Sequence, residues 1–320
     1  MRVLQVMAPR DVRIVDLPEP TPGEGQVLLR VRASAICTVH ELKVFHGDYP
    51  PEMLAVTYPE PPGFPGHEAA GEVVAVGPGV THLAPGQLVA TTGIGGEGTH
   101  AELLVRQADC VFALPEGADP AAAALCEPAG CVLHAIDLAG PLGGRTVAVA
   151  GLGPTGLIAV QWVRRAGAES VVGIDPVEPR RVLAERLGAN ETVDPRAPGA
   201  SERLERAAEV VIECSGNARS VEQSFRTADR LLVIFGYTSD PIHVDQAVWF
   251  HRELEIRNAR ILGPEPMVTF GRAVAAFAAG DLDLAPLVSR RLPLESYEEA
   301  LNLLAERQAL KVVLTPQVGA

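Results

Sequence analysis

The chain has 320 residues, 47% of them hydrophobic, and a formal net charge of −13 at pH 7. This length accommodates two domains with sizeable cores, and the acidic balance argues against nucleic acid as a partner, because phosphate binding needs clustered cations. No apolar stretch approaches the roughly 20 residues that span a bilayer, so no membrane contact is expected. The five cysteines include no C-x-x-C pair, which is typical of a reducing, cytoplasmic compartment and not of a disulfide framework.

The first 138 residues are predicted to be rich in β-strands. Pro-Gly pairs separate short alternating apolar runs, which is the pattern of a barrel or a folded sheet. These runs cover residues 27–31, 70–76, 87–90 and 101–105. The stretch 119–138 then changes to the Ala- and Leu-rich composition of a helix.

From about residue 141, strands and helices alternate with short links. The run TVAVA at 146–150 is continuous and β-branched, as in strands that are buried on both faces of a parallel sheet. The alternation predicts a doubly wound α/β domain. Further strands are expected at 171–175, 191–193, 210–213, 231–235 and 254–257, with a helix at 178–187. An amphipathic helix at 294–307 and a closing strand at 311–315 are expected near the end of the chain.

A glycine-rich turn directly follows the TVAVA strand. Its residues are Gly151, Leu152, Gly153, Pro154, Thr155 and Gly156. In a G-x-G-x-x-G turn between a strand and a helix, the glycines permit a tight turn, let a pyrophosphate approach the backbone and let the helix pack on the sheet. Pro154 suits the first helical position, and the helix N-terminus supplies donors for phosphates. The turn therefore predicts a dinucleotide site, although a turn whose glycines serve packing alone has the same sequence.

An acidic residue, Asp175, stands 19 positions beyond the last glycine, at the end of the next expected strand. Its carboxylate would accept hydrogen bonds from the ribose hydroxyls and repel a 2′-phosphate, which favours NAD over NADP. Arg180 is close enough in the chain to reach the adenosine end of the cofactor. Arg180 and Arg181 together are the feature that leaves NADP as an alternative cofactor.

Residues 64–77, FPGHEAAGEVVAVG, place His67 and Glu68 side by side. Neighbours on a regular strand point to opposite faces, so these two can face one ion only if Pro65-Gly66 bends the chain. The small residues at 69–71 are expected to leave room for a metal, a substrate and the nicotinamide. Taken singly, a cysteine or histidine is more often structural than a ligand.

The motif order resembles the medium-chain dehydrogenase/reductase superfamily, and within it the zinc-dependent alcohol and polyol dehydrogenases of the sorbitol and threonine type. The motifs are GHEAAGEVVAVG, then Leu-Cys-Glu-Pro at 125–128, then GLGPTG and a C-terminal KVVLTP. The resemblance covers nearly the whole chain. It implies an α/β fold with a GroES-like β-barrel catalytic domain (residues 1–138 and 288–320) and an inserted Rossmann domain (residues 139–287). Association into a homodimer or homotetramer is expected through an edge strand such as 254–257.

The resemblance also implies one catalytic zinc ion with three protein ligands and an open position. Cys37 matches the first ligand and His67 the second, and the third is either Glu68 or Glu127. The family's proton-relay Ser or Thr is replaced by Val39. Thr38 as a hydroxyl relay, or His40 as an acceptor that titrates near neutral pH, would take over that role. Alternatively, Thr38 caps a turn and His40 is merely partly exposed.

Two further features depart from the family pattern. The stretch ATTGIGGEGTHAELL at 90–104 has no cysteine where many relatives carry a structural zinc lobe. A long proline-rich segment precedes His67, and its Tyr49, Met53 and Tyr58 are candidate pocket residues. The other histidines are expected to be structural or surface residues; they are His46, His82, His100, His134, His243 and His251.

Together with the resemblance, these features predict reversible oxidation of a secondary alcohol to its ketone with NAD⁺, and the resemblance implies a polyol, diol or amino alcohol as the substrate. A zinc-independent quinone or enone reductase of the same superfamily is one alternative, against which the set Cys37, His67 and Glu127 counts. A non-catalytic NAD(H)-binding protein is the other, supported only by the unusual Cys-Thr-Val-His sequence at 37–40.

Overall fold

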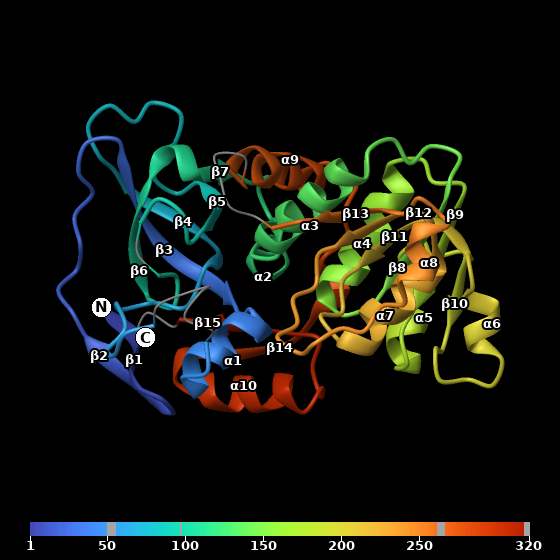
Figure 1. Cartoon of the computed structure of the whole chain (residues 1–320). Helices are drawn as coiled ribbons and strands as arrows, with labels where there is room; N and C mark the ends of the chain where they lie inside the picture. Colours follow the sequence, from blue (N-terminus) through green and yellow to red (C-terminus); the bar gives the residue numbers. More distant parts are fainter. Residues whose placement is uncertain (50–55, 97, 261–265, 317–320) are drawn as a thin grey trace. The chain divides into compact units, whose positions relative to one another are not determined.

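The computed structural model describes residues 1–49, 56–96, 98–260 and 266–316 (Figure 1). The chain divides into two compact units. Unit 1 comprises residues 1–127, 274–280 and 284–320, and unit 2 comprises residues 128–273 and 281–283. Residue 138, the expected domain boundary, lies near the end of helix α3 (Cys126–Ala139), and the division between the units falls near its start.

Unit 1 is built on a seven-stranded sheet of order β14-β15-β3-β4-β5-β7, with β6 paired to β3. Its strands are β3 (Gln26–Ala35), β4 (Glu68–Val76), β5 (Leu88–Thr92), β6 (Leu103–Gln107), β7 (Val111–Ala113), β14 (Val288–Pro293) and β15 (Lys311–Thr315). Strands β1 (Arg2–Ala8) and β2 (Asp11–Asp16) form a separate hairpin. Because β15 pairs with β3, the end of the chain completes the sheet that the N-terminal half begins.

The helices of unit 1 include α1 (Thr38–His46), α2 (Pro120–Ala123) and α10 (Tyr297–Ala305). Helix α1 was not predicted, because threonine, valine, histidine and phenylalanine make its intrinsic helix propensity modest. Val44 and Phe45 of α1 are buried in a core cluster with Tyr297 and Leu301 of α10. Tertiary packing therefore stabilises this helix, and it places the residue before it, Cys37, at a helix N-terminus.

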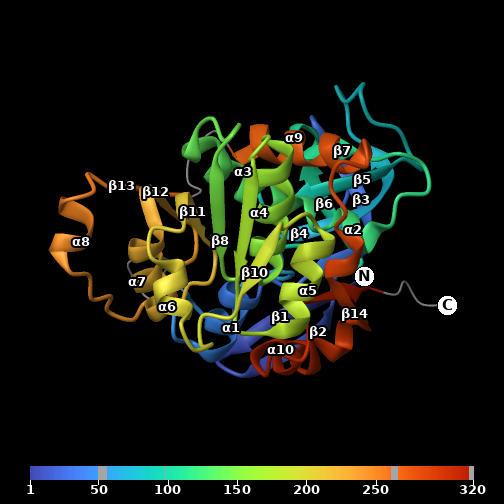
Figure 2. The ribbon, with the colours of Figure 1, turned by 90° about the vertical axis from the view of Figure 1, so that its right-hand side faces the viewer.

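Unit 2 contains a six-stranded parallel sheet of order β10-β9-β8-β11-β12-β13 (Figures 1 and 2). The strands are β8 (Thr146–Ala150), β9 (Ser170–Ile174), β10 (Glu191–Val193), β11 (Ala208–Glu213), β12 (Ala228–Ile234) and β13 (Glu255–Asn258). Between them lie α4 (Pro154–Arg165), α5 (Glu178–Arg186), α6 (Ala200–Leu204), α7 (Ala218–Thr227) and α8 (Gln246–Phe250). The strand order runs in opposite directions from β8, so right-handed crossovers place α4 and α5 on one face and α7 on the other. This confirms the predicted doubly wound domain.

Two helical regions differ from expectation. The helix predicted over 119–138 is divided into α2 and α3, and α9 (Pro266–Ala278) was not predicted. Moreover, the stretch Pro120–Ala139 is 20 residues long and apolar enough, by length and composition, to cross a membrane. The expectation that no stretch reaches this length was therefore wrong. Since 72% of its most apolar window is buried inside the protein, it packs as a core helix does.

Candidate metal and dinucleotide sites

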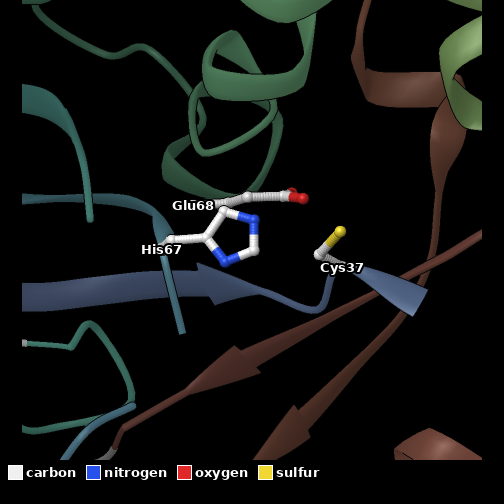
Figure 3. Close-up of side chains that lie close together, drawn as sticks. All are labelled: Cys37, His67 and Glu68. Carbon is white, nitrogen blue, oxygen red and sulfur yellow. The ribbon is translucent and has the colours of Figure 1, made fainter. Parts of the chain in front are cut away.

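Three predicted ligand residues come together where β3 ends and β4 begins in the unit 1 sheet (Figure 3). Cys37 follows β3 as the N-cap residue of α1, His67 directly precedes β4, and Glu68 is the first residue of β4. One possible ligand atom from each residue lies within 4.8 Å of the other two. A turn at residues 62–65 precedes β4, and the consecutive residues His67 and Glu68 both contribute to the same group of ligand atoms.

Packing within unit 1 accounts for two of the small residues that follow Glu68. A Cβ atom on Gly71 would lie 2.3 Å from the carbonyl oxygen of Arg30 on β3. Ala69 belongs to a buried core cluster of unit 1. Close pairing of β3 and β4 therefore requires Gly71, and Ala69 packs in the core, so room at the ligand group is not needed to explain these two residues. Beside the ligand group it is Gly93 that must be small, because a Cβ atom added to Gly93 would lie 2.6 Å from the Cβ of His67.

The hydrogen bonds of His67 and Glu68 leave ligand atoms available. His67 Nδ1 lies 2.9 Å from the carbonyl oxygen of Pro65, and donation from Nδ1 leaves Nε2 as the free lone pair. Glu68 Oε1 accepts a hydrogen bond from Lys311 at 2.6 Å. Glu68 Oε2 is buried without a hydrogen-bond partner among the described residues. A buried carboxylate oxygen without a donor is costly unless a cation or another donor reaches it.

Lys311, on β15, is a buried cation that contacts the ligand residue Glu68. Its ammonium donates to Glu68 and also, at 2.7 Å, to the carbonyl oxygen of Ile36. Burial lowers the pKa of Lys311, but Glu68 and Cys37 outweigh it, so the pKa lies above its ordinary value and the lysine stays charged. Lys311 therefore fixes one oxygen of Glu68 and the residue preceding Cys37.

The group has a strongly anionic field. Burial lowers the pKa of His67, but the Cys37 thiol and then the carboxylates of Glu127 and Glu68 outweigh it and raise this pKa well above its ordinary value. Surroundings that favour a proton on His67 also favour a metal cation. A thiol, an imidazole and a carboxylate are the ligand types that zinc takes, with a fourth position left open at catalytic sites. The residues present therefore fit a zinc ion.

Glu127, the alternative third ligand, is the second residue of α3. Its charge contributes to the raised pKa of His67, but the group of ligand atoms within 4.8 Å comprises Cys37, His67 and Glu68. In the described structure Glu68 therefore has the better placement for a ligand, and Glu127 acts on the group through its charge.

The two predicted proton carriers lie at the start of α1. Thr38 is half-buried as the first helical residue. His40 Nδ1 lies 3.0 Å from the hydroxyl of Tyr49, and the His40 ring contacts His67 edge-on at 5.2 Å between centroids. Burial, with a smaller contribution from His67, lowers the pKa of His40 to about 4. His40 is therefore neutral at neutral pH and does not titrate there as expected.

The candidate pocket residues have different placements. Tyr49 contacts His40 edge-on at 5.3 Å between ring centroids, which places it beside the ligand group. Tyr58 donates its hydroxyl to the carbonyl oxygen of Val44 and packs against the core of unit 1. Met53 lies outside the described residues.

The predicted dinucleotide turn in unit 2 has the expected geometry. Gly151 adopts a φ of +84°, and a Cβ on Gly156 would lie 1.8 Å from the carbonyl oxygen of Gly151. A Cβ on Gly153, the N-cap residue of α4, would meet nothing within 4 Å. The first and third glycines are thus required by the backbone itself. The second faces open space at a helix N-terminus, where a pyrophosphate could approach.

Asp175 is buried just beyond β9 and is held by the same turn. Its Oδ2 accepts from the Leu152 amide at 2.8 Å and its Oδ1 from the Val177 amide at 2.8 Å. Arg180 lies 3.8 Å from Asp175 Oδ2, and Arg181 donates to the Asp175 carbonyl oxygen at 2.8 Å. The carboxylate is therefore fixed in orientation, because each of its oxygens accepts a hydrogen bond from a backbone amide.

Sequence reasoning missed three residues of the unit 1 site. Lys311 was noted only as part of a strand and of the KVVLTP motif, Glu41 was not considered, and His100 was grouped with the structural or surface histidines. Lys311 and His100 were visible as uncommon residue types, since the chain has two lysines and eight histidines. Their contacts with Glu68 and Glu41 could not be read from the sequence.

Comparison with known proteins gives a consistent picture. The alcohol dehydrogenase GroES-like domain model matches residues 23–116, and the zinc-binding dehydrogenase model matches residues 154–276. L-threonine 3-dehydrogenase of Thermococcus kodakarensis is 28% identical over 96% of this chain and 95% of its own length. These matches confirm the predicted pairing of a GroES-like domain with a Rossmann-like domain.

Two solved structures share the fold along their whole length. A Sinorhizobium meliloti protein described as a zinc-binding dehydrogenase and bound to NADP has a TM-score of 0.87, with 29% identity over 98% of this chain and 99% of its own. Galactitol-1-phosphate dehydrogenase of Escherichia coli has a TM-score of 0.83, with 25% identity over 99% of this chain and 100% of its own. The chain therefore belongs to the zinc-type medium-chain dehydrogenase/reductase superfamily and is an oxidoreductase.

Proposed function

We propose that the protein is a zinc-dependent NAD(H) oxidoreductase that interconverts a secondary alcohol, such as a polyol, diol or amino alcohol, and its ketone. The observation that carries the proposal is the buried oxygen of Glu68 beside Cys37 and His67, which has no hydrogen-bond partner within the part of the chain that the structure describes. The alternative of a zinc-free quinone or enone reductase leaves this oxygen unexplained. A non-catalytic dinucleotide-binding protein would not need the ligand group at all.

In the proposed reaction, zinc and NAD⁺ would have different roles from the protein's own residues. Zinc would supply Lewis acidity that lowers the pKa of an alcohol, and NAD⁺ would accept the hydride. Cys37, His67 and Glu68 would hold the metal, and Lys311 keeps Glu68 in place. Tyr49 and His40 line the side of His67, where they would contact the alcohol. Thr38 at the start of α1 is the remaining hydroxyl that could accept the alcohol proton.

For the cofactor we propose NAD(H), since the Asp175 carboxylate would repel a 2′-phosphate. Arg180, 3.8 Å from Asp175, is the group that would favour NADP, and the Sinorhizobium meliloti relative is bound to NADP. The KM values for the two cofactors test this proposal. A KM for NAD⁺ that is less than about threefold below that for NADP⁺ would contradict it, because one repelled phosphate corresponds to at least that factor.

The proposed partners and location follow from smaller observations. Strand β13 ends the parallel sheet and its residues are exposed, so it could pair with its copy in a homodimer or homotetramer. All five cysteines are free thiols, in agreement with a cytoplasmic location. Neither nucleic acid nor membrane is proposed as a partner.

The activity is tested by offering NAD⁺ and NADP⁺ with polyols, diols, β-hydroxy amino acids and aliphatic secondary alcohols. We expect turnover of at least one secondary alcohol, about one equivalent of bound zinc, and loss of both in Cys37→Ser. Cys110→Ser is the matched control, because Cys110 is buried in the same unit but outside the ligand group. Activity that persists without zinc would favour the quinone or enone reductase. Absence of turnover with every alcohol would favour the binding protein.

A further inference from the structure

Unit 1 contains a buried carboxylate–imidazole pair, Glu41 and His100, that contacts the backbone of the ligand residue Cys37. Glu41 of α1 and His100, which precedes β6, have side chains that are 0% exposed, with 2.8 Å between Glu41 Oε2 and His100 Nε2. The other oxygen of Glu41 accepts a hydrogen bond from the backbone amide of Cys37 at 2.9 Å. Burying such a pair costs desolvation free energy, so the pair by itself is weak evidence for a role in stability. Its contact with a ligand residue points to another role.

The far side of the His100 ring is also fixed. His100 Nδ1 lies 2.8 Å from the hydroxyl of Ser34 on β3, and that hydroxyl lies 2.7 Å from the hydroxyl of Thr99. The ring of Tyr297 contacts His100 at 5.4 Å between centroids. Both ring nitrogens of His100 are therefore hydrogen-bonded, and the ring has one orientation.

Residues Thr99 and His100 also hydrogen-bond to the backbone that directly precedes His67. The Thr99 amide donates to the Gly66 carbonyl oxygen at 3.0 Å, and the His100 amide donates to the Gly63 carbonyl oxygen at 3.1 Å. A Cβ on Gly66 would lie 2.7 Å from the ring atoms Cγ and Nδ1 of His100. Residue 66 therefore packs directly on the ring, and His100 contacts both segments that carry ligands.

We propose that Glu41 and His100 are positioning residues for the metal centre, which hold the segments of Cys37 and His67 at the spacing that one ion requires. This inference rests on the proposed function, because it assumes that the ligand group binds metal. Cys37 is the N-cap residue of α1 and has no side-chain cap. Glu41 is the acceptor that fixes its backbone. Without that acceptor, the partly buried amide of Cys37 loses its partner and the thiolate loses its fixed position.

The chain offers a conservative variant and a disruptive one at the same position. Glu41→Gln retains an oxygen for the Cys37 amide, and its amide group can donate to His100 while His100 donates to Ser34. Glu41→Ala removes both hydrogen bonds. His100→Phe keeps an aromatic ring against Gly66 and Tyr297 but removes both ring nitrogens. Glu102→Gln is the control, because Glu102 is a buried carboxylate of the same unit that pairs with Arg2 at 2.7 Å.

The experiment replaces the native metal with Co²⁺ in the full chain and records the thiolate-to-cobalt absorption band, the Co²⁺ dissociation constant and the thermal midpoint of the metal-free protein. We expect Glu41→Ala and His100→Phe to weaken Co²⁺ binding about 10- to 100-fold and to shift the band, as loss of an outer-shell partner does. Glu41→Gln should restore binding to within about threefold, and Glu102→Gln should bind Co²⁺ as the wild type does. If Glu41→Ala does not fold, His100→Phe and Glu41→Gln carry the comparison.

The outcomes separate the two proposals. Wild-type protein that shows no thiolate-to-cobalt band refutes the metal site and the proposed function. A wild-type band that Glu41→Ala and His100→Phe leave unchanged refutes the positioning role alone. Equal weakening in Glu102→Gln also refutes the positioning role, since general loss of stability then explains the effect.

Discussion

The two candidate sites of this protein are constructed in opposite ways. The dinucleotide turn of unit 2 consists of six consecutive residues, and its backbone requires two of its glycines. The ligand group of unit 1 consists of residues far apart in the chain, and Lys311 and Glu68 alone are separated by 243 positions. One site depends on local backbone conformation, while the other depends on buried charges that the whole sheet brings together.

This difference determines which substitutions each site tolerates. A local turn tolerates changes elsewhere in its unit but not an added side chain at a crowded glycine. A buried group of charges tolerates little change in any member, because each charge is compensated by the others. The three predictions below test this contrast, beginning with the largest expected effect.

Lys311→Met should be the most damaging change. It leaves the buried Glu68 carboxylate without its cation, and removing one partner of a buried pair costs about 3–5 kcal/mol. Urea unfolding of the metal-free protein measures the effect on unit 1. Lys43→Met, at the only other lysine of the chain, is the control and should change stability by less than about 0.5 kcal/mol.

A double variant sharpens this prediction. Glu68→Gln combined with Lys311→Met leaves no charge buried at the pair, so it should recover more than half of the lost stability. If the double variant is as unstable as Lys311→Met, the loss comes from packing of the lysine stem and not from an uncompensated carboxylate.

Gly156→Ala should have the next largest effect, and it should be confined to unit 2. The new Cβ would lie 1.8 Å from the Gly151 carbonyl oxygen, so the turn must shift, at a cost of about 1–3 kcal/mol. Gly153→Ala is the matched comparison, since its Cβ meets nothing within 4 Å. Both should weaken NADH binding, measured by fluorescence, but only Gly156→Ala should lower the unfolding midpoint. Equal midpoints would show that the turn adapts to the extra methyl group.

His40→Gln should have the smallest effect, and only at acidic pH. Burial lowers the pKa of His40 from 6.5 to about 4. Between these values the unfolded chain binds a proton that the folded chain does not, so wild-type stability falls as the pH falls. From pH 7.5 to pH 5 this loss is about 2 kcal/mol in the metal-free protein, and His40→Gln should lack it. Urea unfolding at the two pH values measures the difference, with exposed His46→Gln as the control. An unchanged pH dependence in His40→Gln would contradict the lowered pKa.

The elements that could be predicted from the sequence were those with a strong local pattern. The TVAVA strand and the KVVLT strand lie where their β-branched runs placed them, and the closing helix near residue 300 followed from its apolar spacing. Helix α1 was missed because Val44 and Phe45 stabilise it through packing against α10 and not through propensity.

The residues of the candidate sites also differ in whether a local sequence pattern identifies them. Gly151, Gly153, Gly156 and Asp175 could be identified because a turn, a helix and a strand end follow one another within 25 residues. His67 and Glu68 could be singled out as adjacent potential ligands, but the assignment of Cys37 and His67 to a zinc ion came from the resemblance of their surrounding motifs to a known family. Lys311 belongs to the KVVLTP motif, but no sequence pattern indicates which residues Lys311, Glu41 or His100 would contact. Their partners lie on other strands and loops.

The sequence by itself determined the doubly wound unit and its glycine-rich turn, because glycine conformation and strand periodicity act within a few residues. Only the tertiary structure decided which carboxylate faces Cys37 and His67, which lysine compensates it and which histidine lies behind it. These choices depend on strand register and on the burial of charges, and both are set by contacts between residues far apart in the chain.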